Sequence, residues 1–594
     1  MGWIDPAIVI IYLFVMVGVG LWCAKQSSKG MRSYFLGGNK VPWWVLAASG
    51  SASNYDVTGT MFLVSVFYVM GLKSFYLWWS WQFFASAFLL GYMALWVYRT
   101  KAMTAVELLH ARFGDDRGGK LARSAGAVLM VAFLLFSIGY SFVGISKFLP
   151  TILPEGLPFH ENGKVWAAAI MVMTMIYVTA GGFRGVVLTD MIQACLMSIG
   201  GLLVAYLAFS KLTPEAVAVV KEKFITGLGP VETIGSDTFG WHEFSKFLPY
   251  WICMGFLIHM NGAGGHYQEQ RFLAARSERD VAKVGFGWGL FLVPRWLMIA
   301  GITFIAIAGL VEVDDPEKIL PLVVHEMFPV GLRGLILAAL AAAFMSTLSS
   351  VLNAASGMVV RDIVQPACPN MSEKKLIRIG YGVTVASLLI GFGIGSQADS
   401  ISGIWSWMMA GLIGGMLVPN ILRWHWWRFN GVGYSTGLFS ALTVAAITGF
   451  GNYLEVPWLT LPEYISAPII WVTSLIGSVV GSLLSKPTDM ETLKKFYTNV
   501  RPFGCWGPVK AVLTPADLPE QVGPTKSIGL VITNVILGFC LMLGMYYGGF
   551  LCVGHLWSQA VPYLIMAVAC AIALFFTWYK KVMELSDTPP ETEE

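Results

Sequence analysis

The chain has 594 residues, of which 56% are hydrophobic and only 12% are charged. Because soluble domains carry roughly 25% charged residues, this composition predicts an integral membrane protein. The formal net charge of +4 is small for this length, so the composition gives no support for nucleic-acid binding. The eight cysteines show neither CxxC nor metal-ligand spacing, and we interpret them as packing residues.

Fifteen mostly apolar stretches are long enough to cross a membrane as helices, which takes about 20 residues each. In chain order they are 6–24, 42–70, 75–98, 125–147, 165–180, 186–209, 247–265, 284–311, 334–360, 377–396, 403–422, 433–451, 464–485, 527–549 and 557–579. The first stretch resembles a signal peptide, but the segment SYFLGGNKVPWW follows it where a small-residue cleavage site would stand. We therefore expect it to remain as a transmembrane helix.

Lysine and arginine are unequally divided between the two sides of these spans. With the N-terminus outside, 29 of the 39 fall in inside segments, nine fall outside, and Arg295 lies within a span. Because positive residues accumulate on the cytoplasmic side, the N-terminus is predicted outside and the C-terminus inside. The longest inside segment, 486–526, is too short to hold a signalling or enzymatic domain.

Two predicted spans are interrupted by Gly, Ser and Asn. The second contains LAASGSASNYDVTGTMF (46–62), and the seventh contains FLIHMNGAGGHYQEQ (256–270). Their separation by five spans predicts inverted repeats of spans 2–6 and 7–11, each beginning with a broken helix that borders a binding site. For either segment alone, close helix packing is the alternative explanation.

The ninth span contains AAFMSTLSSVLNAAS (342–356), which is unusually rich in hydroxyls. At helical spacing one face carries Ser346, Ser349, Ser350, Asn353 and Ser356, with Thr347 beside it. Hydroxyls also bond between helices in membranes, but this density favours a site for a hard cation such as sodium.

Four ordered motifs resemble those of the sodium/solute symporter family, which includes sodium-coupled sugar, proline and sialic acid carriers. The motifs are VPWWVLAASGSASN (41–54), GGFRGVVLTDMIQ (181–193), QRFLAARS (270–277) and AAFMSTLSSVLNAASGMVVRDI (342–363). The resemblance covers roughly residues 6–485 and implies an all-α integral membrane fold of the LeuT type, with a five-helix inverted repeat core behind one additional helix. Spans 14 and 15 lie beyond the usual thirteen, and the sequence predicts no role for them.

The resemblance divides the chain into seven regions. These are a leading helix with an inside loop (1–40), two parts of the core (41–265 and 266–425), spans 12 and 13 (426–485), a cytoplasmic loop (486–526), two additional helices (527–580) and a cytoplasmic tail (581–594).

By position, the resemblance implies a shared sodium site. Its ligands are the carbonyls of Ala52, Tyr55 and Ala343 and the hydroxyls of Ser346 and Thr347. Some family members bind a second sodium beside a carboxylate, and the matching residues here are Asp190, Ser346, Ser349 and Ser350. The alternative for Asp190 is a charge pair with Arg184. One or two sodium ions are therefore expected, and no organic cofactor is implied.

The pocket departs from the pattern of the family's sugar carriers. Asn54 fits, but Gly59 stands where those carriers have an amide and Trp78 where they have an acid. Gly265 replaces their asparagine, and Leu292 aligns with their pocket lysine. A galactose-type set of hydrogen bonds is therefore not implied.

Other polar groups take their place. Asp56 and Arg295 are ionisable residues at membrane depth, which makes them functional candidates, and arginine suits a substrate carboxylate. The alternative is that these two residues only pair with each other, and His266 alone also fits a helix end. The predicted substrate residues are Asn54, Asp56, Trp78, Trp81, Gln82, Gly265, His266, Tyr267 and Arg295.

These features predict a sodium-coupled symporter that imports a small polar solute by alternating access. A sugar or sugar acid is the leading solute and an amino acid the second. We expect a monomer embedded in the lipid of a cell membrane, a bacterial inner membrane. A sensor would carry a signalling domain, a channel-like leak would carry filter repeats, and an enzyme would carry a metal or nucleophile cluster; the sequence indicates none of these.

Overall fold

The computed structural model describes the chain apart from residues 1–2, 28–30, 154–157, 226–243, 261–267, 399–400, 402–403, 406–407, 454–455, 457–458, 460, 519–520 and 589–594. Within the described residues all regular structure is helical, and ten helical segments are long and apolar enough to cross a membrane. They are formed by α1 (Ile4–Ser27), α9 (Arg117–Ile152), α10 (Gly163–Lys211), α15 (Glu278–Leu290) with α16 (Val293–Ile307), α18 (Leu332–Met358), α20 (Glu373–Ser396), α23 (Gly431–Tyr453), α24 (Glu463–Leu484), α27 (Ile528–Val553) and α28 (Trp557–Leu574). The all-helical membrane fold is thereby confirmed.

Helix α10 corresponds to two predicted spans. At 1.5 Å per residue its 49 residues would extend about 74 Å, more than twice a hydrocarbon core of roughly 30 Å. A kink at Gly182, with φ 55° and ψ −161°, separates its two arms. A Cβ at this position would lie 2.9 Å from the Tyr34 carbonyl oxygen, so both the backbone angle and the close approach require glycine.

The four remaining predicted spans are formed by shorter helices. They comprise α3 (Trp43–Ser53) with α4 (Val57–Met70); α5 (Ser74–Trp78), η3 (Trp79–Phe83), α6 (Phe84–Phe88), η4 (Leu89–Met93) and α7 (Ala94–Arg99); α13 (Phe244–Met260); and η8 (Met408–Ile413) with α22 (Gly414–His425). Length and composition select ten helical segments among the described residues as membrane spans. The predicted total of fifteen spans therefore stays a prediction.

Short helices join these segments. They are α2 (Met31–Leu36), η1 (Gly37–Asn39), η2 (Gly71–Lys73), α8 (Glu107–Phe113), α11 (Pro214–Val220), η5 (Lys221–Ile225), α14 (Glu269–Leu273), η6 (Pro316–Lys318), α17 (Ile319–Met327), η7 (Val359–Val364), α19 (Gln365–Ala367), α25 (Met490–Val500), α26 (Gly507–Lys510), η9 (Phe575–Tyr579) and α29 (Lys580–Val582).

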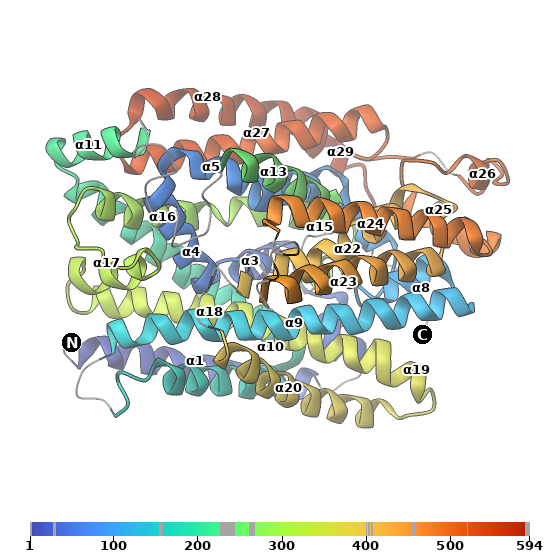
Figure 1. Cartoon of the computed structure of the whole chain (residues 1–594), viewed down its shortest axis with the longest axis horizontal. Coiled ribbons are helices and arrows are strands. Elements are labelled where there is room, and N and C mark those ends of the chain that lie inside the picture. The colour runs from blue at the N-terminus through green and yellow to red at the C-terminus, as the bar shows by residue number, and fades with distance from the viewer. Residues whose placement is uncertain are drawn as a thin grey trace.

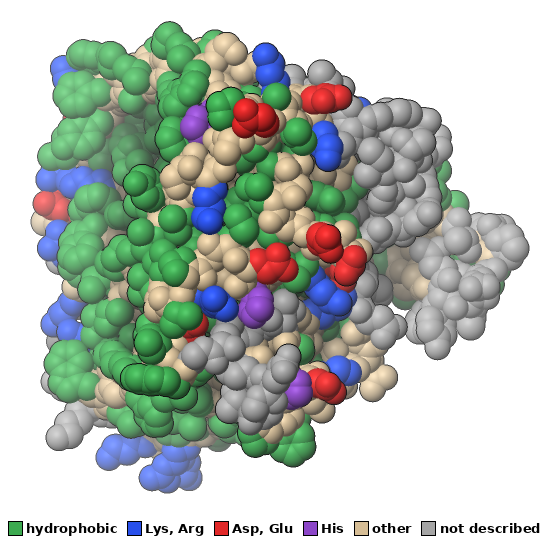
Figure 2. Space-filling model, turned by 90° about the vertical axis from the view of Figure 1, so that its left-hand side faces the viewer, with side chains coloured by type: hydrophobic (Ala, Val, Ile, Leu, Met, Phe, Trp, Pro, Cys, Tyr) green, Lys and Arg blue, Asp and Glu red, His purple; other side chains and the backbone are tan. Residues whose placement is uncertain are grey.

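The connecting helices gather at the two ends of the bundle (Figure 1). Helices α8, α19, α25 and α26, all from segments predicted inside, lie at one end, whereas α11 and α17, predicted outside, lie at the other. The end that carries α11 and α17 shows charged and polar side chains scattered over its face (Figure 2). Segments predicted on the same side of the membrane therefore lie at the same end of the bundle. Which of the two ends is cytoplasmic is predicted from the lysine and arginine count alone.

The second span is broken over residues 54–56, between α3 and α4. Asp56 adopts φ 24°, and its carboxylate caps α4 by accepting hydrogen bonds from the Thr58 and Gly59 amides at 3.2 and 2.9 Å. Aspartate is a strong helix cap, so the side chain compensates the unusual backbone at this break. The interruption expected in the seventh span, at 261–265, lies outside the described residues.

Candidate functional site

A cavity of about 80 Å³ lies beside the break in the second span. Five predicted substrate residues line it, namely Asn54, Asp56, Trp78, Gln82 and Arg295. Thr347, from the predicted sodium site, lines it as well. Small-molecule pockets usually measure about 300–1,000 Å³, so a sugar-sized solute requires these walls to move apart.

Arg295 reaches the cavity from the first turn of α16 and is 3% exposed. Its Nε donates a hydrogen bond to the Thr60 hydroxyl at 3.1 Å, and its charge attracts the Asp56 carboxylate. Tyr140 of α9 contributes a side-chain hydrogen bond to the same carboxylate. The cavity therefore presents one negative and one positive group, each held by neighbouring polar atoms.

Gly59 leaves the space in which these two charged groups lie. A Cβ at this position would be 2.7 Å from Asp56 Oδ2 and 3.4 Å from Arg295 Nη2. The first distance is shorter than real Cβ contacts, so any larger residue would displace the carboxylate. The absence of a side chain at position 59 is thus linked to the present placement of Asp56 and Arg295.

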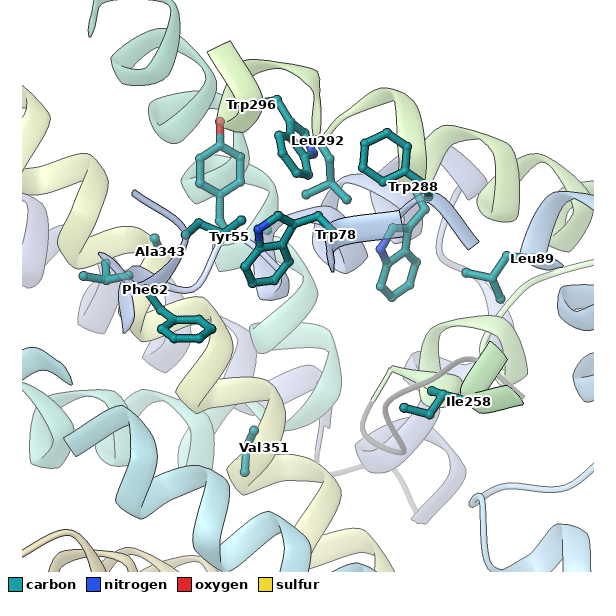
Figure 3. Packing of buried hydrophobic residues seen from close by; sticks show 14 of the residues in the cluster. Tyr55, Phe62, Trp78, Leu89, Ile258, Trp288, Leu292, Trp296, Ala343 and Val351 are labelled. Carbon is teal, nitrogen blue, oxygen red and sulfur yellow. The ribbon is translucent and has the colours of Figure 1, made fainter. Parts of the chain in front are cut away.

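Amide and aromatic groups form the other walls. Gln82 accepts a hydrogen bond from Trp296 Nε1 at 3.1 Å. Trp78 and Phe62 meet edge to face with ring centroids 6.0 Å apart, and in the close view Trp78 is drawn between Phe62 and Leu292 (Figure 3). Apolar rings beside hydrogen-bonding groups suit a solute with both a polar edge and an apolar face.

Several cavity residues were missed by the sequence analysis. They include Ser137, Tyr140 and Ser141 on α9, Gln268 just before α14, and Trp405, Met408 and Met409. Gln268 donates to the Asn54 side-chain oxygen at 2.6 Å. The spacing of 137, 140 and 141 places three polar side chains on one helix face, and this signal could have identified them.

The other four predicted substrate residues cannot be compared with the cavity. Gly265, His266 and Tyr267 lie outside the described residues. The backbone of Trp81 lies within η3, but its side chain is not described.

Of the predicted shared sodium ligands, Thr347 joins α18 to the broken end of α3. The Thr347 hydroxyl lies 2.9 Å from the Ser53 carbonyl, at the broken end of α3, and 3.2 Å from the Ala343 carbonyl. The Ala52 carbonyl accepts the Tyr55 amide at 3.0 Å, and the Tyr55 carbonyl accepts the Thr60 hydroxyl at 2.8 Å. This neutral oxygen set suits a sodium ion passing through as cargo.

Ser346, the fifth predicted ligand, points elsewhere. Its hydroxyl donates to Asp190 Oδ1 at 2.6 Å. Asp190 Oδ2 accepts from the Ser49 hydroxyl at 2.6 Å and from Arg271 Nη2 at 2.9 Å. Asp190 is 0% and Arg271 1% exposed, so this ion pair is fully buried. The partner of Asp190 is Arg271 of α14, and the alternative pair with Arg184 is wrong.

One serine of the possible second sodium site, Ser350, contacts the same guanidinium. Arg271 donates to the Ser350 hydroxyl at 2.7 Å and to the Ser49 hydroxyl at 2.9 Å. Ser349 and Ser350 both donate to the Ser346 carbonyl at 2.9 Å. Asp190, Ser346 and Ser350 therefore lie together, but a cationic side chain of the protein already lies beside the carboxylate. A second sodium ion would have to displace or share it.

Comparison with known proteins identifies relatives of the whole core. A family model described as the sodium:solute symporter family matches residues 34–443. The chain is 25% identical to a sodium/glucose cotransporter of Vibrio parahaemolyticus over 513 residues, covering 81% of this chain and 91% of the relative. It is 25% identical to a sodium/proline symporter of Haemophilus influenzae over 534 residues, covering 83% and 97%.

A similar fold is found among solved structures. A Na+-coupled sialic acid symporter in a substrate-bound, outward-open state superimposes with a TM-score of 0.62, covering 82% of this chain and 99% of that one. At 19% identity this likeness supports the fold. Since the family model matches more than half of the residues, the chain belongs to the sodium:solute symporter family.

Proposed function

We propose that this protein couples the inward movement of sodium to the import of a small polar solute by alternating access. One observation supports this most directly: a single cavity is lined by Asp56 and Arg295, which suit a solute, and by Thr347, a predicted sodium ligand. Sodium binding at Thr347 would therefore affect the walls around the solute, and solute binding at Asp56 and Arg295 would affect the surroundings of the sodium ion.

The coupling follows from the position of Thr347. Its hydroxyl contacts carbonyls at the end of α3 and within α18, so a sodium ion among these oxygens would hold the two helices together. Because α3 ends at the residues that begin the cavity, ordering this end also orders the solute site. Each sodium ion that enters with the membrane potential contributes about 2.3 kcal/mol per 100 mV.

The side chains of the cavity favour a sugar acid or a neutral sugar. Arg295 provides a planar fork for a carboxylate, whereas Asp56 and the amides of Asn54, Gln82 and Gln268 suit hydroxyls. An amino acid is the second candidate, because one guanidinium and one carboxylate in the same cavity also complement a zwitterion. We place the protein as a monomer in a bacterial inner membrane with its C-terminus in the cytoplasm.

Uptake into proteoliposomes tests this function. A panel of a hexuronate, a neutral hexose and a proteinogenic amino acid would be offered under an inward sodium gradient and under a matched potassium gradient. Uptake of one solute above its equilibrium level under sodium alone is expected. Equal uptake under both gradients would indicate a channel-like leak, and binding without uptake would indicate a sensor.

A further inference from the structure

Helices α27 and α28 lie outside the region that matches the family, yet they pack on the transport core. They form a hairpin along one side of the bundle (Figure 1). Helix α27 packs against α16, which carries Arg295, and against α6 in the third span. A C-terminal addition therefore borders the two segments that supply Arg295 and Gln82.

Tyr546 of α27 is fully buried against the transport core, at 0% exposed. Its hydroxyl donates to the Gly289 carbonyl at 2.6 Å. Gly289 lies in the last turn of α15, directly before the junction with α16, and its carbonyl also accepts the Leu292 amide at 3.2 Å. The Tyr546 hydroxyl thus binds the backbone at the joint that positions the first turn of α16.

The ring of Tyr546 is also connected to the cavity wall, through the side chain of Trp296. It stacks on the Trp296 ring with centroids 5.4 Å apart and an interplanar angle of 14°. Trp296 in turn donates to Gln82, which lines the cavity, at 3.1 Å. Trp296 lies beside Leu292 near the junction (Figure 3).

Helix packing alone would not need this hydroxyl. Phe550, one turn further along α27, packs against Phe67, Phe75 and Phe304 with an apolar ring. The environment of Tyr546 differs because a buried polar group is aimed at a backbone carbonyl at a helix joint. Buried hydroxyls are costly unless they are bonded, so this contact specifies the place of both partners.

Building on the proposed function, we propose that Tyr546 is a positioning residue for solute recognition. It fixes the α15–α16 joint through its hydroxyl and the Trp296–Gln82 pair through its ring. The C-terminal hairpin thereby holds Arg295 and Gln82 at the separation that the solute requires, without touching the sodium site at Thr347.

Tyr546→Phe removes the hydroxyl and keeps the ring. For the solute that wild-type protein transports, we expect KM to rise about fivefold to tenfold, the loss typical of one buried hydrogen bond, with kcat and the half-saturating sodium concentration within twofold of wild type. Tyr547→Phe is the matched control, because Tyr547 contacts Phe75 and Tyr563 instead. Tyr546→Leu, which also removes the stack, should raise KM further, and its effect should not add to that of Gln82→Leu.

A second measurement is independent of transport. Hydrogen exchange should accelerate in Tyr546→Phe over residues 286–296 and 79–84, but not in Tyr547→Phe. Unchanged KM and unchanged exchange would overturn the proposed role, as would equal shifts in the solute and sodium dependences, which would indicate general loosening. If wild-type protein transports no solute of the panel, the proposed function fails while the exchange result still decides the role of Tyr546.

Discussion

Replacing Arg271 by glutamine would leave the Asp190 carboxylate buried without its charged partner. The guanidinium donates to Asp190, Ser49 and Ser350 at 2.7–2.9 Å, and both charged residues are at most 1% exposed. Removing one member of such a pair costs about 3–5 kcal/mol, because the remaining charge stays desolvated. We therefore expect Arg271→Gln to have a clearly lowered Tm when choline replaces sodium.

Sodium should reverse part of this loss if Asp190 belongs to a second sodium site. At a sodium concentration 100-fold above the dissociation constant, binding to the folded state recovers about 2.7 kcal/mol. The measurement is Tm against NaCl at constant ionic strength, with choline chloride as the replacement salt. Arg271→Gln should respond to sodium more steeply than wild type, and the double variant Asp190→Asn with Arg271→Gln should be stable and lose the additional response.

Two results would refute this reasoning. An Arg271→Gln variant as stable as wild type in choline would show that the buried pair contributes little. A lowered Tm with the same sodium response as wild type would show that the carboxylate does not take up sodium even when the arginine is gone. Solute transport would then depend on the Thr347 site alone, with one sodium ion per solute molecule.

Three further variants test the remaining parts of the site. Thr347→Ala should raise the half-saturating sodium concentration at least tenfold, because a contact to a charge contributes about 1.5–3 kcal/mol, whereas Thr347→Ser should stay near wild type in the same uptake titration. Arg295→Lys should weaken binding of an acidic solute in a thermal-shift titration, since the planar fork is lost. If Arg295 serves only as the partner of Asp56, each single neutral variant leaves a buried charge unpaired and loses uptake, and the double variant Asp56→Asn with Arg295→Gln should restore uptake of the same solute. Gly59→Ala should raise the solute KM, because its Cβ would lie 2.7 Å from Asp56 Oδ2, and an unchanged KM would show that the carboxylate moves freely.

The helical fold could be predicted from the sequence because the bilayer demands long apolar runs, and the break at residues 54–56 follows from short polar residues there. The sequence predicted that Thr347 faces carbonyls at the broken end of α3, and its hydroxyl contacts the Ser53 carbonyl there, whereas the sodium site itself stays a prediction. The partner of Asp190 could not be predicted. Arg271 lies 81 residues away on a five-residue helix, whose sequence does not reveal which way its side chain points.

The contact between the C-terminal hairpin and the transport core also could not be predicted from the sequence. Nothing in the apolar pattern of 527–549 marks Tyr546 as different from the aromatic residues around it. Its role follows only from the carbonyl that its hydroxyl meets on α15. Contacts between distant segments depend on the relative placement of whole helices, which periodicity within one helix does not determine.

The missing side chain at Gly59 constrains how this transporter can change its solute over evolutionary time. Because a Cβ there would collide with the Asp56 carboxylate, a side chain at position 59 and the present arrangement of Asp56 are mutually exclusive. An amide introduced first would disrupt the existing site before a new one could form. A side chain can therefore be added at position 59 only together with a change that moves the Asp56 carboxylate out of this space, so positions 56 and 59 are coupled.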